Sequence, residues 1–150
     1  MVDQRHGFTM IELLIVISII AILAAAIIPN FIGFDTEARV AAAKGNLDTL
    51  RTRIILYRAK EGVYPASLSD LLNRNYLDAG VQKPYLQKIP PELISVKRGS
   101  NEYRAQRSDE PLTGEGGWVY YTDTADVVIN LDQPLDRSWG DYAEQRPSQW

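Results

Sequence analysis

Glu12 is the residue whose type and position carry the clearest chemistry in this sequence. It precedes a run from Leu13 to Phe34 that contains no charged residue. An ionised carboxylate at the edge of lipid is costly unless it gains a cation or a proton. Cleavage between Gly7 and Phe8 would create an α-amine about one helical turn before Glu12, and this amine could neutralise the carboxylate in its own chain or in a packed neighbour. The alternative interpretation is a first-turn acid that the helix dipole favours.

The residue inventory excludes several kinds of catalysis. The chain has no cysteine, which removes disulfides, thiolate nucleophiles and cysteine-based metal centres. The single histidine, His6, lies before the Gly7–Phe8 bond, so a chain cut there would contain no imidazole for triad catalysis. Residues 109–150 contain nine acids and two bases, which argues against a nucleic-acid site in that region. We therefore expect a protein that is not an enzyme.

Aspartates in the C-terminal part of the chain are weak candidates for a Ca²⁺ site. They are Asp123, Asp126, Asp132 and Asp136, with Asp141 nearby. Hard oxygen ligands in a loop suit Ca²⁺, but the spacing fits no fixed loop motif, and aspartate is common in turns for its own hydrogen bonds. A carboxylate pair for glycoside hydrolysis could be drawn from the same residues, yet nothing in the sequence places two of them at a cleft. No other cofactor is expected.

Glu12 lies near the start of the apolar stretch 8–34. This stretch predicts a transmembrane helix. At about 1.5 Å per residue the uncharged run forms a helix about 33 Å long, close to the hydrocarbon thickness of a bilayer. A buried core helix is disfavoured because 150 residues cannot readily surround it. A secretory signal peptide is disfavoured because the run is long and starts with a carboxylate. Pro29 cannot donate to the carbonyl of Ala25, so a kink is predicted there.

The N-terminal residues carry a family resemblance. Gly7-Phe8-Thr9-Met10-Ile11-Glu12, followed by the apolar run with Pro29, is similar to the N-terminal region of type IV pilins and type II secretion pseudopilins. The resemblance extends over residues 5–62. It implies that residues 1–7 are a class III leader peptide, that a prepilin peptidase cuts after Gly7, and that the Phe8 amine is N-methylated. It also implies that Glu12 meets a neighbour's Phe8 amine during assembly and that the stretch around Pro29 takes part in filament packing.

A second helical pattern, over residues 35–62, predicts an amphipathic continuation of the first helix. Apolar side chains recur at spacings of three and four residues: Val40, Ala43, Leu47, Leu50, Ile54 and Tyr57. This stripe favours packing on a core over a coiled-coil seam, because the repeat is short. Gly62 is expected to end the helix in a left-handed conformation.

Residues 63–131 are predicted to form a globular α+β region. Ser67 is a candidate cap for a short helix. Segments 118–122 and 127–131 predict an antiparallel hairpin, and an earlier strand is expected at either 93–97 or 102–106. Residues 132–150 are polar and indicate a loop or tail. The fold class is therefore α+β and pilin-like: a long N-terminal helix, transmembrane in its first half, packed on a small antiparallel sheet.

The resemblance implies a structural subunit of a pilus-like filament that acts in type II protein secretion across the outer membrane, most like a major pseudopilin. The resemblance implies a homopolymer, with other pseudopilins, a prepilin peptidase, an inner-membrane assembly platform and a cytoplasmic ATPase as partners. It implies a single-pass protein of the bacterial inner membrane, with a periplasmic C-terminal domain that enters a periplasmic or extracellular filament.

Two alternatives stay open. A cysteine-free type IV pilus subunit is one, because residues 92–97 stand where major pseudopilins have an Asp-Pro-Trp-Gly-like turn. A minor filament subunit that binds substrate or DNA is the other. Its candidate DNA residues are Arg98, Arg104 and Arg107 around Tyr103, although a solvated loop is the simpler interpretation and a nucleic-acid partner is not expected.

Overall fold

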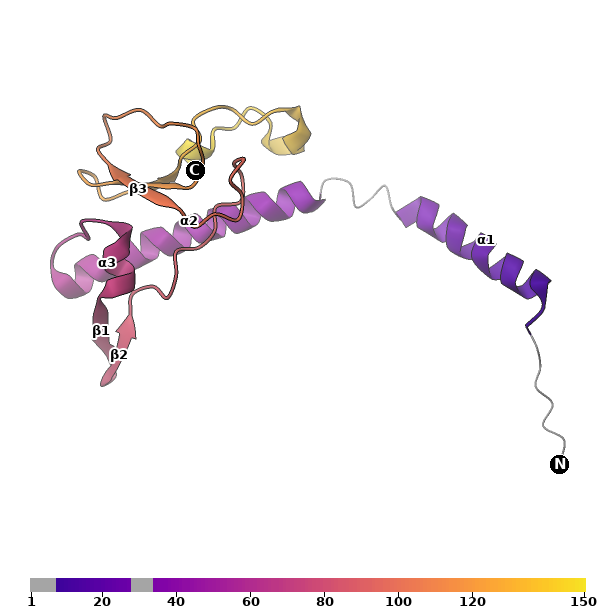
Figure 1. Ribbon diagram of the computed structural model, residues 1–150, viewed down its shortest axis with the longest axis horizontal. Helices are drawn as coiled ribbons and strands as arrows, with labels where there is room; N and C mark the ends of the chain where they lie inside the picture. The colour runs from indigo at the N-terminus through magenta and orange to yellow at the C-terminus, as the bar shows by residue number, and fades with distance from the viewer. Residues whose placement is uncertain (1–7, 28–33) are drawn as a thin grey trace. The chain divides into compact units, whose positions relative to one another are not determined.

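Two long helices lead into a domain of short helices and strands. The computed structural model describes residues 8–27 and 34–150, and the chain divides into two compact units, Met1–Asp35 and Thr36–Trp150. The first described elements are α1 (Met10–Ile27) and α2 (Phe34–Glu61), both labelled in Figure 1. Residues 1–7, which include Gly7, and the predicted kink at Pro29 lie outside the described residues.

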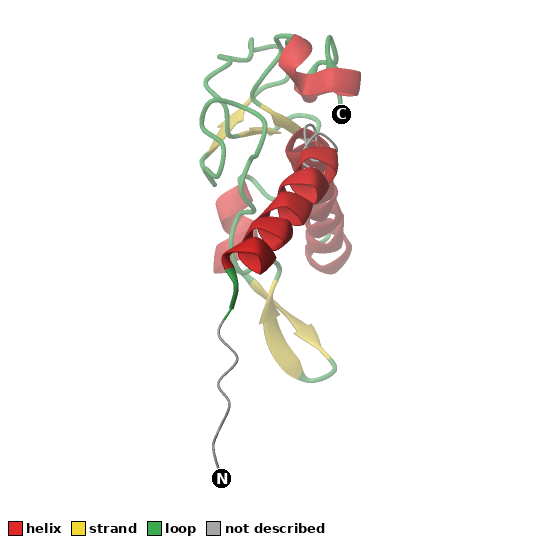
Figure 2. Ribbon diagram, turned by 90° about the vertical axis from the view of Figure 1, so that its right-hand side faces the viewer, coloured by secondary structure: helices red, strands yellow, loops and turns green. Residues whose placement is uncertain are grey.

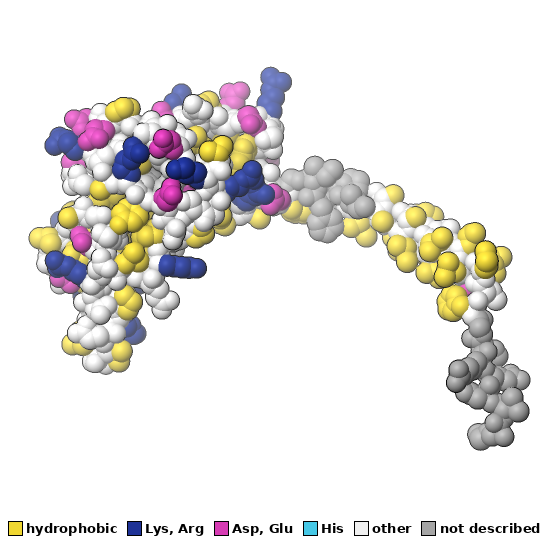
Figure 3. Space-filling model, viewed as in Figure 1, with side chains coloured by type: hydrophobic (Ala, Val, Ile, Leu, Met, Phe, Trp, Pro, Cys, Tyr) yellow, Lys and Arg dark blue, Asp and Glu magenta, His cyan; other side chains and the backbone are white. Residues whose placement is uncertain are grey.

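The α1 helix has the properties of a membrane-spanning segment. None of its 18 residues is buried, and Figure 3 shows apolar side chains along it. Among the described residues it is the one helix that is long and apolar enough to cross a membrane. The Ser18 hydroxyl donates to the carbonyl oxygen of Leu14 at 2.7 Å, so the helix itself satisfies this polar group, as a lipid environment requires.

The predicted stripe of α2 is confirmed by its burial. The buried residues of this helix are Val40, Ala43, Leu47, Leu50, Ile54 and Tyr57, the six that the spacing predicts. The helix ends at Glu61, and the N–H of Gly62, whose φ is +79°, donates to the carbonyl of Arg58 at 2.9 Å. Gly62 therefore forms the left-handed helix end that the sequence indicates.

A short capped helix and a hairpin follow α2. The α3 helix (Leu68–Asn73) starts with a capping box between Ser67 and Asp70, which confirms the predicted cap. Next, β1 (Asn75–Asp78) pairs antiparallel with β2 (Val81–Pro84), and Figure 2 shows this hairpin extending away from the other strands. The sequence did not predict the hairpin, because its turn uses Ala79 and Gly80, with φ of 49° and 84°, in place of the usual Asn-Gly or Asp-Gly signal.

The second sheet has three strands in the order β3-β4-β5. The strands β4 (Trp118–Tyr121) and β5 (Val127–Ile129) pair antiparallel, which confirms the predicted hairpin. The strand β3 (Tyr103–Gln106) takes the second of the two expected positions, and it runs parallel to β4, so this sheet is mixed. Residues 93–97 form no strand, because they lie in the loop that Glu92 closes by exchanging backbone hydrogen bonds with Gly99 and Ser100.

One apolar cluster joins α2, α3 and the three-stranded sheet. Its members on the sheet are Trp118, Tyr120, Val127 and Ile129, all buried. Residues 132–150 carry more packing than their polar composition suggests. They form two short 3₁₀ helices, η2 (Arg137–Tyr142) and η3 (Pro147–Gln149). Leu135 belongs to the buried cluster, and three aromatic side chains of this segment pack against it: Trp139, Tyr142 and Trp150. The predicted α+β, pilin-like fold class is confirmed.

Candidate assembly site

Thr9 and Glu12 form a capping box at the start of α1. The backbone N–H and the hydroxyl of Thr9 both donate to Glu12 Oε2, at 2.9 and 2.7 Å. In return, the N–H of Glu12 donates to Thr9 Oγ1 at 3.2 Å. These bonds satisfy donors that a helix start leaves without a carbonyl partner. The sequence interpretation considered only the charge of Glu12 and missed Thr9 as a site residue. The Thr-x-x-Glu spacing is the sequence pattern that indicates this cap.

The cap leaves Glu12 able to accept a further partner. Both bonds from Thr9 end on Oε2, whereas an ionised carboxylate accepts at both of its oxygens. Glu12 is exposed, and Phe8 is 76% exposed, so the start of the helix is open to another molecule. The cleavage role of Gly7 and the assembly role of Pro29 fall on residues outside the described ranges and stay predictions.

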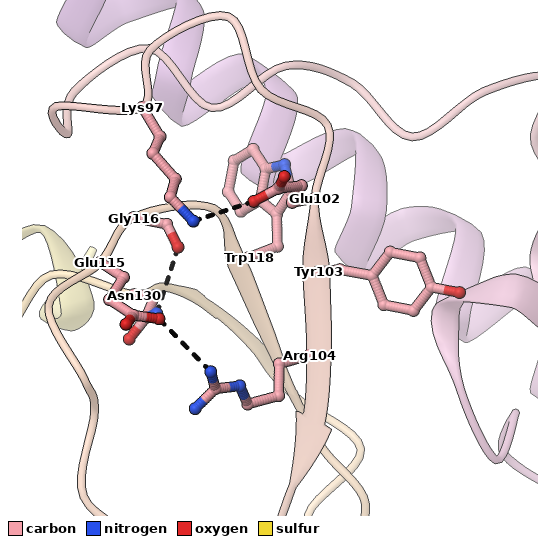
Figure 4. A pocket seen from close by; sticks show the side chains of 8 residues that line it. All are labelled: Lys97, Glu102, Tyr103, Arg104, Glu115, Gly116, Trp118 and Asn130. Carbon is pink, nitrogen blue, oxygen red and sulfur yellow. Dashed lines mark hydrogen bonds and ion pairs between the residues drawn. The ribbon is translucent and has the colours of Figure 1, made fainter.

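A small polar pocket lies beside the three-stranded sheet, and Figure 4 shows its lining residues. It has a volume of about 80 Å³. Lys97 Nζ lies 3.1 Å from Glu102 Oε2, and Arg104 Nη2 lies 3.4 Å from Glu115 Oε2. Two ion pairs thus neutralise the charged groups of the pocket. Its lining residues supply no hydroxyl nucleophile beside a base, which is the arrangement that acyl or glycosyl transfer would need.

Two of the three candidate DNA arginines, Arg104 and Arg107, are held in ion pairs. Tyr103 and Arg104 are consecutive in β3, so their side chains leave the strand on opposite faces, and Figure 4 shows the two side chains pointing in different directions. Arg104 is paired with Glu115, and Arg107 Nε lies 3.1 Å from Asp109 Oδ1. A base-stacking platform needs aromatic rings and free cations on the same face, so Tyr103, Arg104 and Arg107 lack the required arrangement.

Two of the four aspartates named as weak Ca²⁺ candidates form ion pairs. Asp126 Oδ1 lies 3.0 Å from Arg51 Nε, and Asp132 Oδ2 lies 3.2 Å from Arg146 Nη1. Both pairs are partly exposed and tie loops to α2 or to the C-terminal segment. A carboxylate held by a guanidinium is already neutralised, which weakens it as a ligand for a cation.

The other two aspartates accept hydrogen bonds from serines. Asp123 accepts from the N–H and hydroxyl of Ser108, and Asp136 accepts from the N–H and hydroxyl of Ser138. These bonds favour the ionised carboxylates and lower the pKa of Asp123 and of Asp136. Across residues 8–27 and 34–150, no three acidic or histidine side chains are grouped so that they could hold a metal ion.

Glu92 is a buried carboxylate that sequence reasoning missed. Its residue is fully buried, and the side chain accepts from the N–H of Ile94, from the hydroxyl of Ser95 and, at 2.9 Å, from the N–H of Ser95. All these donors belong to the turn that follows, so the carboxylate organises residues 92–100. Its signal in the sequence is an acid set among apolar residues, in the stretch that replaces the Asp-Pro-Trp-Gly-like turn.

The fold and the N-terminal site define the class: a protein with a prepilin-type N-terminal helix, capped at a carboxylate and followed by an α+β domain. The family described as the prokaryotic N-terminal methylation motif matches residues 3–28. The chain is 31% identical over 101 residues to the type II secretion system core protein G of Escherichia coli (strain K12), covering 60% of this chain and 67% of that protein. This chain belongs to the family of type II secretion system core protein G, among the type IV pilin-like proteins.

Two further relatives are similar to this chain, one a core protein G and one a type IV pilin. The protein of the same description from Pseudomonas aeruginosa is 30% identical over 100 residues, which cover 58% of this chain and 66% of that protein. The type IV major pilin protein PilA of Myxococcus xanthus is 53% identical over 49 residues, covering 33% of this chain and 22% of that protein. The match to the two core protein G relatives thus spans about two thirds of their length. No solved structure is significantly similar to this chain.

Proposed function

We propose that this protein is a structural, non-enzymatic subunit of a pilus-like filament that acts in type II protein secretion. In this proposal a prepilin peptidase removes residues 1–7 by cutting between Gly7 and Phe8, and the new Phe8 amine is N-methylated. The α1 helices of successive copies then form the filament core, together with those of other pseudopilins. The family to which the chain belongs and the methylation motif at residues 3–28 support this assignment.

The observation that carries the proposal is a capped carboxylate at the start of an exposed apolar helix. The bonds to Thr9 hold the Glu12 side chain toward the beginning of the helix, on the side where cleavage would create an amine. When lipid around α1 is replaced by neighbouring helices, the carboxylate is desolvated and gains from a cation. The Phe8 amine of a neighbouring copy supplies that cation and fixes the axial position at which the neighbour joins.

Before assembly, we propose that α1 spans the inner membrane once and that residues 36–150 lie in the periplasm. The length of α1 and the lack of buried residues in it support the membrane location. An inner-membrane platform would extract the subunit, and a cytoplasmic ATPase would supply the energy for this step, because moving an apolar helix out of lipid is uphill unless packing against other helices replaces the lost contacts.

A second candidate is a cysteine-free type IV pilus subunit. The 53% identity to the Myxococcus xanthus pilin favours it over a limited part of the chain. Deleting the gene distinguishes the two candidates. Loss of secreted proteins with intact surface pili supports the secretion role, whereas loss of surface pili with normal secretion supports the pilus role.

The central test is a cleavage-site variant, Gly7→Leu, compared with Gly45→Leu. Gly45 lies on an exposed part of α2 where an added Cβ meets no atom within 4 Å, so this control changes a glycine without blocking the site. We expect intact-mass measurement of membrane protein to give a chain starting at methylated Phe8 for the wild type and the control, and an uncut chain without filaments for Gly7→Leu. A mature mass from Gly7→Leu would overturn the proposed processing.

A further inference from the structure

A groove lined by basic and aromatic residues lies between the β1–β2 hairpin and α2. We call it the basic groove and define it by Arg53, Tyr76 and residues 83–88. Its volume is about 560 Å³, which is large enough to receive several side chains of another molecule. The rings of Tyr76 and Tyr85 are 4.8 Å apart, and Tyr85 also contacts Tyr57 of α2 at 4.9 Å. Tyr76, which is partly exposed, thus lines the groove and packs on the buried ring of Tyr85.

Two cations of the basic groove are available to a partner. Lys83 Nζ is bound to Asp78 at 2.7 Å, but Arg53 and Lys88 make no ion pair with any residue in the described part of the chain. Arg53 is partly buried and Lys88 is exposed. The guanidinium of an arginine presents a forked donor that fits a carboxylate better than a point charge would. The groove is thus suited to an acidic segment.

The same domain carries a matching acidic surface. We call residues 136–144, which include η2, the acidic lobe. Asp136, Asp141 and Glu144 are exposed there, against one base, Arg137. Asp141 and Glu144 make no ion pair within the described residues. The lobe is fixed to the domain by the buried Leu135, whose backbone bonds to Glu144 at 2.8 Å and to Gln145 at 3.0 Å.

The acidic lobe and the basic groove lie at different places along α2. Lys44, in the first half of α2, lies 5.7 Å from the ring of Tyr142 in the lobe, whereas the groove is built around Arg53 and the hairpin near the other end. Figure 1 shows η2 and the β1–β2 hairpin on opposite sides of the domain. When two complementary surfaces lie at separate places on one chain, one copy can bind the next head to tail. Such a contact can repeat along a filament without closing into a ring.

We propose that the basic groove of one copy receives the acidic lobe of the next copy in the filament, with Arg53 and Lys88 facing Asp141 and Glu144. This inference rests on the proposed filament function. Charge complementarity identifies the occupant, because residues 109–150 carry nine acids and two bases while residues 35–108 carry thirteen bases and eight acids. The contact is exposed, so it sets the register of the domains and weakens with salt, while α1 supplies most of the cohesion.

The absence of cysteine from the chain makes disulfide cross-linking a direct test. The full-length variants Lys88→Cys and Glu144→Cys are expressed together, each chain carrying one cysteine, and filaments are oxidised. We expect a mixed dimer of the two variants. The matched control pairs Arg98→Cys, an exposed base outside the groove, with Glu144→Cys, and we expect little mixed dimer. Filaments that form normally but yield no Lys88–Glu144 dimer, or equal dimer in the control, would overturn the contact.

A charge exchange provides a second readout. Arg53→Glu with Lys88→Glu should lower filament yield about tenfold, the size expected for the loss of two exposed ion pairs. Adding Asp141→Lys and Glu144→Lys to the same chain should restore the yield. If the fourfold variant gives as few filaments as the double variant, the proposed pairing is contradicted. Failure of the wild-type chain to form any filament would instead refute the proposed function, so the two failures are distinguishable.

Discussion

The hydroxyl of Tyr120 donates to the carbonyl oxygen of Pro65 at 2.6 Å, in the buried interior of the domain. This bond joins the middle strand of the three-stranded sheet to the segment that follows α2. The carbonyl of the buried Pro65 is removed from water, so it cannot easily replace the phenol as its hydrogen-bond donor. The bond therefore links the end of the long helix to the sheet.

We predict that Tyr120→Phe destabilises the domain by about 1 to 3 kcal/mol, the cost of leaving a buried carbonyl without its donor. Chemical unfolding of the full chain in detergent, followed by tryptophan fluorescence, measures the change. Tyr103→Phe, at a partly exposed tyrosine of β3, should shift the free energy of unfolding by less than about 0.5 kcal/mol. Equal effects of the two substitutions would contradict a specific role for the Tyr120 bond.

The same tyrosine makes stability depend on alkaline pH. Burial raises the pKa of Tyr120 from 10.0 to about 12. The neutral phenol is thus favoured in the folded state, and its contribution is complete below pH 10 and is lost as pH rises from 10 toward 12. We expect the free energy of unfolding to fall over this interval in the wild type, and to fall less in Tyr120→Phe. Parallel pH profiles for the two proteins would show that Tyr120 is not responsible.

The capping box at Thr9 allows the two roles of Glu12 to be separated. Glu12→Gln keeps an oxygen that can accept from Thr9 but removes the charge, whereas Glu12→Leu removes both. We predict that both variants insert into the membrane and that both fail to form filaments, because assembly needs the carboxylate charge. Thr9→Val removes one capping hydroxyl, retains the charge and should lower filament yield only modestly, since caps contribute about 1 kcal/mol. Membrane fractionation and electron microscopy give the two readouts. Normal filaments from Glu12→Gln would mean that the cap alone matters.

Gly116 is a position where the fold tolerates no side chain. A Cβ there would lie 2.0 Å from Ser95 Oγ, and the residue has φ of +87°. We predict that Gly116→Ala destabilises the domain by about 2 to 5 kcal/mol, from the strained backbone and the clash together. Gly114→Ala is the matched control, because Gly114 has φ of +74° but open space around it, and it should cost about 1 to 2 kcal/mol. Thermal unfolding compares the two, and a smaller effect at Gly116 than at Gly114 would be inconsistent with this packing.

The placement of the aspartates leads to a prediction about calcium. Asp123, Asp126, Asp132 and Asp136 each have a separate partner within the chain. We therefore expect the melting temperature of the purified protein to be the same in calcium as in a chelator. A rise in melting temperature with calcium, saturating at one equivalent, would show that these loops rearrange into a site.

Elements whose signal is local were predicted well from the sequence. The stripe from Val40 to Tyr57 repeats every three or four residues, and burial of that face follows directly from helical geometry. Ser67 and Asp70 have the spacing of a capping box, and the β4–β5 hairpin consists of two short runs of strand-forming residues around a turn. Each of these features is decided by residues within a few positions of one another.

Elements that depend on distant residues were not predictable in the same way. The direction of β3 relative to β4 is set only when the two strands pair in the folded domain. Their register places Tyr103 opposite Trp118, and the sequence of either strand alone does not determine this pairing. The hairpin at Ala79 and Gly80 lacks the usual turn residues. Burial of Glu92 depends on the turn that folds over it. At the N-terminal site, the spacing of Gly7, Phe8 and Glu12 carries the prediction, whereas the capping role of Thr9 is missed when Glu12 is considered only as a charge.

The burial of the α2 stripe has a consequence for the newly made chain. The ribosome releases the stripe, which ends at Tyr57, well before Val127, which lies 70 residues later and belongs to the cluster that covers it. At about 5 to 20 residues per second, this interval lasts about 4 to 14 seconds. During it, the stripe lacks the part of its apolar cover that Val127 and Ile129 later supply. A chaperone that binds amphipathic helices would therefore bind the apolar stripe of α2, the surface that is buried in the folded domain.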